Sequence, residues 1–171
     1  MFRRFDASSV IKDNIIYVLG GFNGGPIPEI LFLDLTNSMT IGSPPWSQSL
    51  KPSPLAFSSS GAVLGGPNNN FIFSRKTMGD ATQLNERTQF SIISDNNGNA
   101  YLHGGYNNGV FLGDTYFFDT ISITWTMLLA PQIPIFADEF SSVLLNDGRL
   151  LIIRGYGPPE NGVPVYRPIS Q

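Results

Sequence analysis

A chain of 171 residues with 42% hydrophobic and only 13% charged residues is long enough to bury a core and too apolar to stay disordered. Its formal net charge of −3 argues against a surface built to bind nucleic-acid phosphates, so we expect no nucleic-acid partner. The chain has no cysteine, which excludes disulfides and thiolate chemistry.

The N-terminal segment lacks the features of a targeting signal. Arg3 and Arg4 are followed by Asp6, Lys12 and Asp13 rather than by an apolar stretch, which argues against a signal peptide. No apolar run approaches the roughly 18 residues of a membrane-spanning helix. We therefore expect no membrane segment, and an intracellular location by default.

One pattern occurs four times along the chain: an apolar strand, an Asn/Asp/Gly turn and a second apolar strand. In chain order these three parts lie at 8–11, 12–14 and 15–19; 57–60, 65–70 and 71–73; 90–93, 95–98 and 100–103; and 140–145, 146–148 and 150–153. Each copy is predicted to be a β-hairpin, because branched and aromatic residues favour strands and Asn-Gly or Asp-Gly turns tolerate positive φ. The continuous apolar second strands at 15–19 and 150–153 predict burial on both faces.

The first and third copies continue alike beyond the glycines that close their second strands. The first copy has a loop at 22–25 and a predicted strand at 29–33. The third has a loop at 106–109 and a predicted strand at 114–118. Each of these strands ends at an aspartate and is followed by a tryptophan: Asp34 and Trp46, and Asp119 and Trp125. Each complete copy is therefore predicted to contain four strands, which make one blade of a β-propeller.

A glycine pair after the second strand, an aromatic third strand ending in aspartate and a tryptophan beyond it form a motif that resembles the kelch repeat. The positions that carry it are Gly20, Gly21, Asp34 and Trp46 in the first copy and Gly104, Gly105, Asp119 and Trp125 in the third. The segment 42–46 also looks like the first-blade ending of fungal "galactose oxidase-like" kelch proteins. The resemblance covers nearly the whole chain. It implies an all-β, incomplete kelch-type β-propeller with about two full and two partial four-stranded antiparallel blades, in which the motif residues are structural.

The spacing of the positions that close the second strands, 20, 74, 104 and 154, agrees with this interpretation. The first and last intervals are close to the roughly 50 residues of a kelch unit, whereas the middle one is shorter by about 20 residues, or about two strands. We therefore expect a single partial propeller over 1–171, with approximate repeats at 5–54, 55–86, 87–136 and 137–171. Because an open ring leaves blade faces and strand edges without partners, we expect a fragment of a longer propeller or an aberrant gene product.

The resemblance to galactose oxidase implies a copper site of two tyrosines, two histidines and a cysteine cross-linked to one tyrosine. This chain has one histidine and no cysteine, so a copper-radical oxidase is excluded, and neither a metal nor another cofactor is expected. The histidine, His103, has no second histidine or evident carboxylate beside it in the sequence pattern. A structural or incidental role is favoured over metal ligation or general-base catalysis. We expect no catalytic residues.

Three other features have both a functional and a structural interpretation. The glycine pairs follow strands as phosphate-binding loops do, but Pro26 and Pro28 stand where a helix would have to begin, which favours tight backbone packing instead. Asp34 and Asp119 occupy equivalent positions, which favours turn formation through backbone N–H groups over acid–base catalysis. The two tryptophans are predicted to pack between blades rather than to face a ligand.

Any function is expected to reside in the loops. The candidate binding residues are Phe22 and Asn23 in the loop 22–28, and Tyr106, Asn107 and Asn108 in the loop 106–113. The blade-linking segments 47–54 and 130–139 are further candidates, and a purely connecting role fits all of these loops equally well. The leading interpretation is a non-catalytic protein-interaction scaffold, or a fragment of one, whose partner is another protein. The alternative is a carbohydrate-binding or vestigial galactose oxidase-like propeller without the copper site; an adaptor for a larger assembly would need a helical partner domain.

Overall fold

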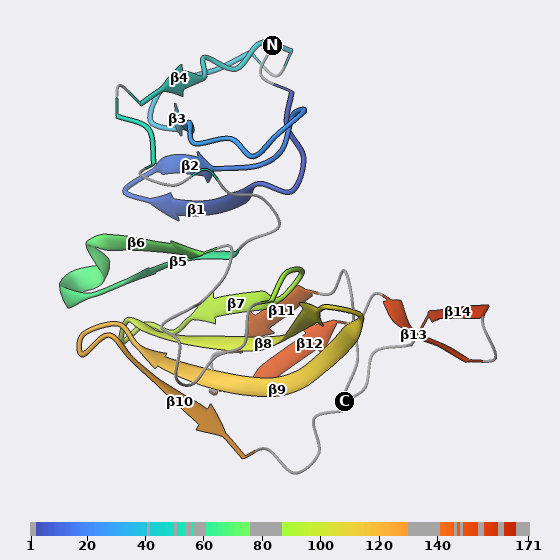
Figure 1. Ribbon diagram of the computed structural model, residues 1–171. Coiled ribbons are helices and arrows are strands. Elements are labelled where there is room, and N and C mark those ends of the chain that lie inside the picture. Colours follow the sequence, from blue (N-terminus) through green and yellow to red (C-terminus); the bar gives the residue numbers. More distant parts are fainter. Residues whose placement is uncertain are drawn as a thin grey trace. The chain divides into compact units, whose positions relative to one another are not determined.

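The computed structural model is built from antiparallel β-strands (Figure 1). It describes residues 3–40, 42–49, 51–53, 56, 61–75, 87–129, 141–145, 147, 149–153, 156–160 and 163–166. The chain divides into two compact units, residues 1–64 with 72–76 and residues 65–71 with 77–171. The predicted all-β class with antiparallel sheets is confirmed. The described part contains no helix long and apolar enough to cross a membrane.

The first unit holds a four-stranded sheet in sequential order. Its strands are β1 (Ser8–Lys12), β2 (Ile15–Leu19), β3 (Ile30–Asp34) and β4 (Ser47–Gln48). The turn between β1 and β2 has positive φ at Asp13 (51°) and Asn14 (60°), as a type I′ hairpin turn requires. The first predicted hairpin and the third strand are therefore confirmed.

The strands β5 (Gly61–Gly65) and β6 (Phe71–Arg75) pair with each other and form a separate two-stranded sheet. A 3-10 turn at Pro67–Asn69 joins them. The predicted first strand of this copy, 57–60, lies outside the described residues, and the described strand begins at Gly61.

The core of the first unit lies between β1–β2 and the β5–β6 hairpin. Val10 and Leu19 are buried there, and apolar side chains from the hairpin and from neighbouring strands pack on them. Of the five residues in β2, Leu19 alone is buried and the other four are half-buried. The prediction that 15–19 is buried on both faces is therefore wrong for most of the strand.

The second unit holds another four-stranded sheet, in the order β10-β9-β8-β7. Its strands are β7 (Ser91–Ser94), β8 (Asn99–Asn107), β9 (Val110–Asp119) and β10 (Thr124–Leu128). Its core is formed by Phe90, Leu102 and Tyr116, and Ile92 and Trp125 pack against them. The third copy therefore has the four strands that the sequence predicts.

The prediction of a loop at 106–113 is wrong, because most of these residues belong to the long β8–β9 hairpin. Tyr106 and Asn107 belong to β8, and residues 110–113 belong to β9, so Asn108 and Gly109 form the turn. These two residues have positive φ, 45° and 89°, and an Asn-Gly pair with this geometry lets both strands continue to the turn.

The described residues of the fourth copy form two short hairpins in the second unit. The strands β11 (Ser141–Leu144) and β12 (Leu150–Ile153) pair with each other, as do β13 (Tyr156–Glu160) and β14 (Val163–Tyr166). Two consecutive prolines lie within β13, and a register shift between Gly157 and Glu160 spans them, because proline cannot donate a ladder hydrogen bond.

The outer strand of the second sheet, β10, carries many solvent-exposed apolar side chains. Exposed hydrophobic residues in and around it are Ile121, Ile123, Met127, Leu128 and Leu129. Leu129, just past the end of the strand, is 91% exposed. An edge strand of this kind has free backbone hydrogen-bonding groups on one side.

Candidate functional site

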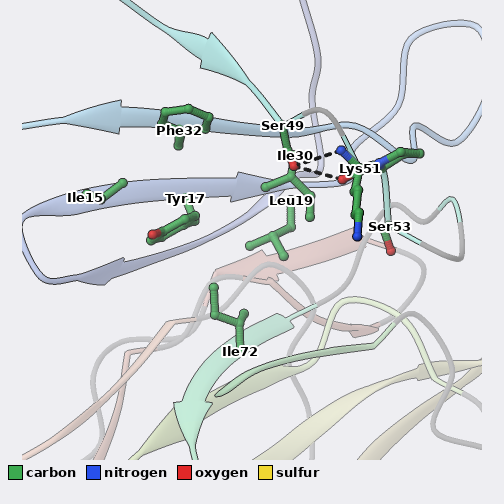
Figure 2. Close-up of a pocket in the computed structure, with 10 residues that line it drawn as sticks. Ile15, Tyr17, Leu19, Ile30, Phe32, Ser49, Lys51, Ser53 and Ile72 are labelled. Atoms are coloured by element: carbon green, nitrogen blue, oxygen red, sulfur yellow. Dashed lines mark hydrogen bonds between the residues drawn. The ribbon is translucent and has the colours of Figure 1, made fainter. Parts of the chain in front are cut away.

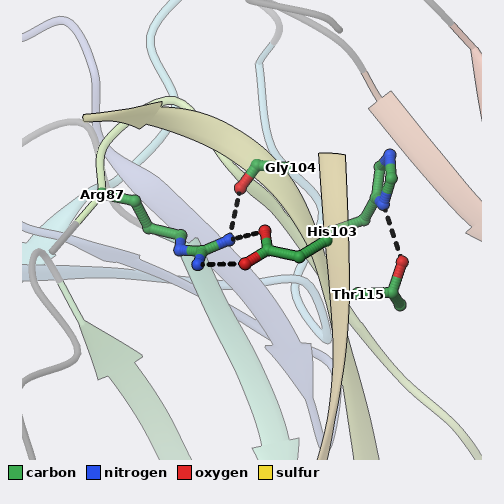
Figure 3. Close-up of polar contacts among 5 residues, drawn as sticks. Arg87, His103, Gly104 and Thr115 are labelled. Atoms are coloured by element: carbon green, nitrogen blue, oxygen red, sulfur yellow. Dashed lines mark hydrogen bonds and ion pairs between the residues drawn. The ribbon is translucent and has the colours of Figure 1, made fainter. Parts of the chain in front are cut away.

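One buried polar cluster is centred on Arg87, which precedes β7 at the start of the third repeat. Arg87 is 1% exposed, and its Nη1 donates to the carbonyl oxygen of Gly104 (2.9 Å). Its Nη1 and Nη2 donate to the two carboxylate oxygens of Asp114 at 2.6 and 2.9 Å (Figure 3). The guanidinium also lies 5.2 Å from the centre of the Tyr116 ring. Arg87 thus links the segment before β7 to β8 and β9 through hydrogen bonds and an ion pair.

The first repeat contains an equivalent arginine, Arg4, which also bonds the first glycine of the pair. Its Nη1 donates to the carbonyl oxygens of Gly20 (2.7 Å) and Glu29 (3.1 Å). The next residue in each repeat makes an antiparallel bridge beyond the glycine pair, Phe5 with Phe22 and Thr88 with Tyr106. The two sheets therefore begin with equivalent backbone geometry.

Sequence reasoning missed both arginines. A signal was present, because Arg4 and Arg87 precede Gly20 and Gly104 by 16 and 17 residues in repeats that align independently. In the sequence, Arg4 stands out only as part of a short basic N-terminal segment. The equivalent positions of the two arginines can be read from the sequence. Their contacts with glycines 16 and 17 residues away depend on how the strands pair.

The glycine pairs are sites of close backbone approach. Gly20 and Gly21 have φ of 65° and 104°, and Gly104 and Gly105 have φ of 61° and 107°. A Cβ on Gly21 would lie 3.0 Å from the Phe5 carbonyl oxygen, and one on Gly105 would lie 2.8 Å from that of Thr88. The second glycine of each pair therefore lies where two backbone segments approach closely.

Asp34 and Asp119 hold turns at the ends of their strands. The Asp34 carboxylate accepts the N–H of Thr36 at 2.8 Å, and the Asp119 carboxylate accepts those of Ile121 (2.8 Å) and Ser122 (3.1 Å). The hydrogen bonds from Thr36 and from Ser122 lower the pKa of Asp34 and Asp119, respectively. Both carboxylates therefore accept backbone hydrogen bonds within the turn that follows their strand.

His103 is buried in β8, and its Nδ1 lies 2.9 Å from the Thr115 hydroxyl oxygen (Figure 3). Thr115 is its register partner on β9. The described residues include no group of three or more His, Asp or Glu side chains positioned to hold a metal ion. The observed contact gives the imidazole a partner within its own sheet.

The two tryptophans have different surroundings. Trp125 stacks on Phe118, its register partner on β9, with ring centres 4.3 Å apart and planes 13° apart. Trp46 is 36% exposed and lines a pocket of about 580 Å³ beside Arg4. Trp125 thus packs within its own sheet, and the predicted packing between blades stays a prediction for both residues.

The candidate binding residues fall into two aromatic clusters, one in each unit. Phe22 packs on Phe5 with ring centres 5.2 Å apart, and Asn23 beside it is exposed. Tyr106 packs edge-on against Phe111 at 5.4 Å. Asn107 is half-buried in β8 and Asn108 is exposed in the turn. Phe22 and Asn23 lie in a loop as predicted, whereas Tyr106 and Asn107 lie in a strand.

A second pocket, of about 680 Å³, lies on one face of β2 and β3 (Figure 2). Apolar side chains from these strands and Ile72 form most of its wall. Polar groups gather at one end, where the Ser49 hydroxyl donates to the Lys51 carbonyl oxygen at 2.9 Å and accepts its N–H at 3.3 Å. The pocket offers apolar burial with a polar edge.

Comparisons with known proteins add information on the fold. No family model matches the chain, and no curated protein matches it. Among 106 matching chains of solved structures is one described as "Structure of YjhT", with a TM-score of 0.60 and 13% sequence identity. The match covers 90% of this chain and 59% of that one, so this chain spans little more than half of its length. At this identity the likeness supports a shared all-β fold.

Proposed function

We propose that the chain is an incomplete kelch-type β-propeller that acts as a non-catalytic protein-interaction scaffold, or is a fragment of one. The observation that carries this proposal is the repetition of one architecture in two four-stranded sheets. Each sheet has an arginine bonded to the first glycine of a pair and an aspartate turn after its third strand. Under the proposal, these sheets are full blades, and the hairpins β5–β6 and β11–β12 are the inner halves of partial ones.

The contacts of the polar groups favour a scaffold over an enzyme. Asp34 and Asp119 accept hydrogen bonds that hold turns, and Arg87 is paired with Asp114. His103 contacts Thr115 inside a sheet. Catalysis usually requires titratable groups that converge on open space, whereas these contacts have structural effects.

The proposed protein partner is assigned to the end of the first sheet where Phe22 and Asn23 follow β2. Phe5 is 60% exposed beside the half-buried Phe22, and such an aromatic pair next to asparagine and glycine offers the apolar area and adaptable hydrogen bonding that interfaces use. In the second unit, Tyr106 and Asn108 occupy the comparable end of β8.

A matched pair of substitutions at opposite ends of one sheet tests this assignment. Asn23 follows β2, and Asn37 follows β3, which runs antiparallel to it. Both asparagines are exposed. We expect a defined protein partner to be retained by the wild type and by Asn37→Lys but lost from Asn23→Lys, as measured by quantitative affinity capture followed by reconstitution with the purified partner. Equal retention by both variants, or no reproducible partner, would contradict the proposal.

The exposure of Trp46 in a pocket favours a second candidate, a carbohydrate-binding or vestigial galactose oxidase-like propeller. Sugars commonly stack on exposed aromatic rings, and stacking changes tryptophan fluorescence. Titration with galactose distinguishes the two candidates: a scaffold predicts no saturable response, and a carbohydrate-binding protein predicts one that Trp46→Leu abolishes.

A further inference from the structure

The two repeat arginines differ in how their charge is compensated. Arg87 is bonded to both carboxylate oxygens of Asp114, which directly precedes Thr115 on β9. Glu29 has the equivalent place in the first repeat, directly before Ile30 on β3. However, the atom of Glu29 that Arg4 contacts is the backbone carbonyl oxygen and not the carboxylate. No ion pair within 4.0 Å joins the charged groups of the two residues. The first repeat thus keeps both the arginine and an acidic residue but lacks the close ion pair between them.

Arg4 also has an unsatisfied donor. Its Nε is buried and has no hydrogen-bond partner among the described residues. Burial lowers the pKa of the guanidinium, the charge of Glu29 raises it, and an arginine stays charged at neutral pH. A buried N–H without an acceptor is costly, and the carbonyl contacts of Nη1 leave the positive charge without a paired carboxylate within 4.0 Å in the described part of the chain.

The pocket beside Arg4 has the size and walls of a small-molecule site. Its volume is about 580 Å³, within the range of roughly 300–1,000 Å³ found for ligand pockets. Val18 and Leu31, from β2 and β3, supply apolar walls, and Trp46 lines the pocket from the segment 42–46. The pocket therefore combines one cation with apolar and aromatic surface.

We propose that this pocket binds a carboxylate attached to a flat apolar ring. The carboxylate pairs with the Arg4 guanidinium at the pocket wall, as the Asp114 carboxylate pairs with that of Arg87. The ring lies against Trp46 and the apolar walls, where stacking contributes beyond simple burial. A free aryl acid and the C-terminal phenylalanine of a peptide share this chemistry. The site is independent of the proposed protein scaffold.

Titration of the full chain with phenylacetate, monitored by calorimetry, tests the proposal. We expect saturable binding that weakens at high salt, and at least about tenfold weaker binding of phenylacetamide, which has the same ring but no charge. Arg4→Gln is expected to lose at least about tenfold in affinity, whereas Arg3→Gln, an exposed neighbour outside the pocket, retains wild-type affinity. Equal binding of the acid and the amide, or no saturable binding of phenylacetate, would overturn the proposal.

Two further variants keep the test decisive if Arg4→Gln does not fold. Trp46→Leu changes an exposed side chain and is expected to weaken phenylacetate binding several-fold while the circular dichroism spectrum is unchanged. Glu29→Gln removes a competing negative charge and is expected to strengthen binding several-fold; unchanged affinity in both variants would contradict the proposal. N-acetyl-alanyl-phenylalanine, compared with phenylacetate, identifies the source: tighter binding of the peptide indicates a C-terminal residue, and tighter binding of phenylacetate indicates a free acid.

Discussion

At the scale of single residues, the structure assigns clear reasons to positions that the sequence marks by repetition. Gly105 and Gly109 both have positive φ, 107° and 89°. Gly105 is pressed against the Thr88 carbonyl oxygen and Phe90, whereas a Cβ on Gly109 would meet nothing within 4 Å. Comparison of the two glycines therefore separates the effect of positive φ, which both have, from the effect of close neighbouring atoms, which only Gly105 has.

We expect Gly105→Ala to destabilise the protein more than Gly109→Ala. Both alanines incur roughly 1–2 kcal/mol for left-handed backbone geometry. Gly105→Ala must also displace backbone, and overpacking of this kind adds about 1–3 kcal/mol. Urea denaturation of the two variants measures the difference in unfolding free energy. Equal losses would show that close approach at Gly105 contributes nothing.

The Asp119 turn predicts a specific pH dependence. Hydrogen bonds from Ser122 and Ile121 lower the pKa of Asp119 below its usual 3.8, so the folded state favours the ionised carboxylate. This stabilisation is present above the unfolded pKa and is lost as the pH falls from about 4 through the folded value. We expect Asp119→Asn to reduce the slope of stability against pH below pH 4, measured by urea denaturation in acid. An unchanged slope would contradict this role.

The sequence was sufficient to predict the contacts of residues whose hydrogen-bond partners are close to them in the chain. Asp34 and Asp119 bond N–H groups two or three positions away, so a repeat position and a residue type predict the contact. The Arg87–Asp114 pair spans 27 residues and depends on where β9 begins. The sequence therefore predicted the turns but not the buried ion pair.

At the scale of elements, local turn chemistry decides which loops form. The sequence gives similar glycine-rich segments after the second strands of both complete copies. Pro26 and Pro28 lack N–H groups, so pairing between β2 and β3 stops at Leu19 and Ile30 and a loop remains. Asn108–Gly109 instead fits a two-residue turn, and β8 and β9 continue to it. Weighing the prolines against the Asn-Gly pair would have distinguished the two.

The stacking of Trp125 on Phe118 predicts that the two tryptophans contribute unequally to the free energy of unfolding. Trp125 is half-buried against Phe118 and the core, whereas Trp46 is more exposed on a pocket. We expect Trp125→Ala to cost about 2–4 kcal/mol of unfolding free energy and Trp46→Ala less than about 1 kcal/mol. Thermal and urea denaturation of both variants provide the measurement. A larger loss for Trp46→Ala would refute this assignment.

At the scale of the whole molecule, contacts concentrate within two compact units. Repeat proteins distribute their stability among units and the interfaces between them, and local opening follows such units. The sequence predicted the recurrence of hairpins because their turns and apolar strands are local features. It did not predict β13–β14, since a loop rich in Gly and Pro has no clear strand pattern.

Hydrogen exchange of two equivalent variants tests this distribution of stability. We expect Gly21→Ala to accelerate exchange in β1–β3 more than in β7–β9, and Gly105→Ala to do the reverse, because each substitution disturbs backbone within one unit. Mass spectrometry of peptic fragments resolves the two regions. Acceleration of equal size in both regions for both variants would indicate that the units open together.

The exposed apolar edge at β10 has a consequence for how the protein behaves at high concentration. From Ile121 to Ala137 the chain contains no Asp, Glu, Lys or Arg, and Leu129 stands almost wholly in solvent. Natural sheets usually place charges on such edges to block intermolecular strand addition. In a crowded solution this strand is therefore the expected starting point for precipitation, and its lack of protective charge limits the conditions under which the molecule remains colloidally stable.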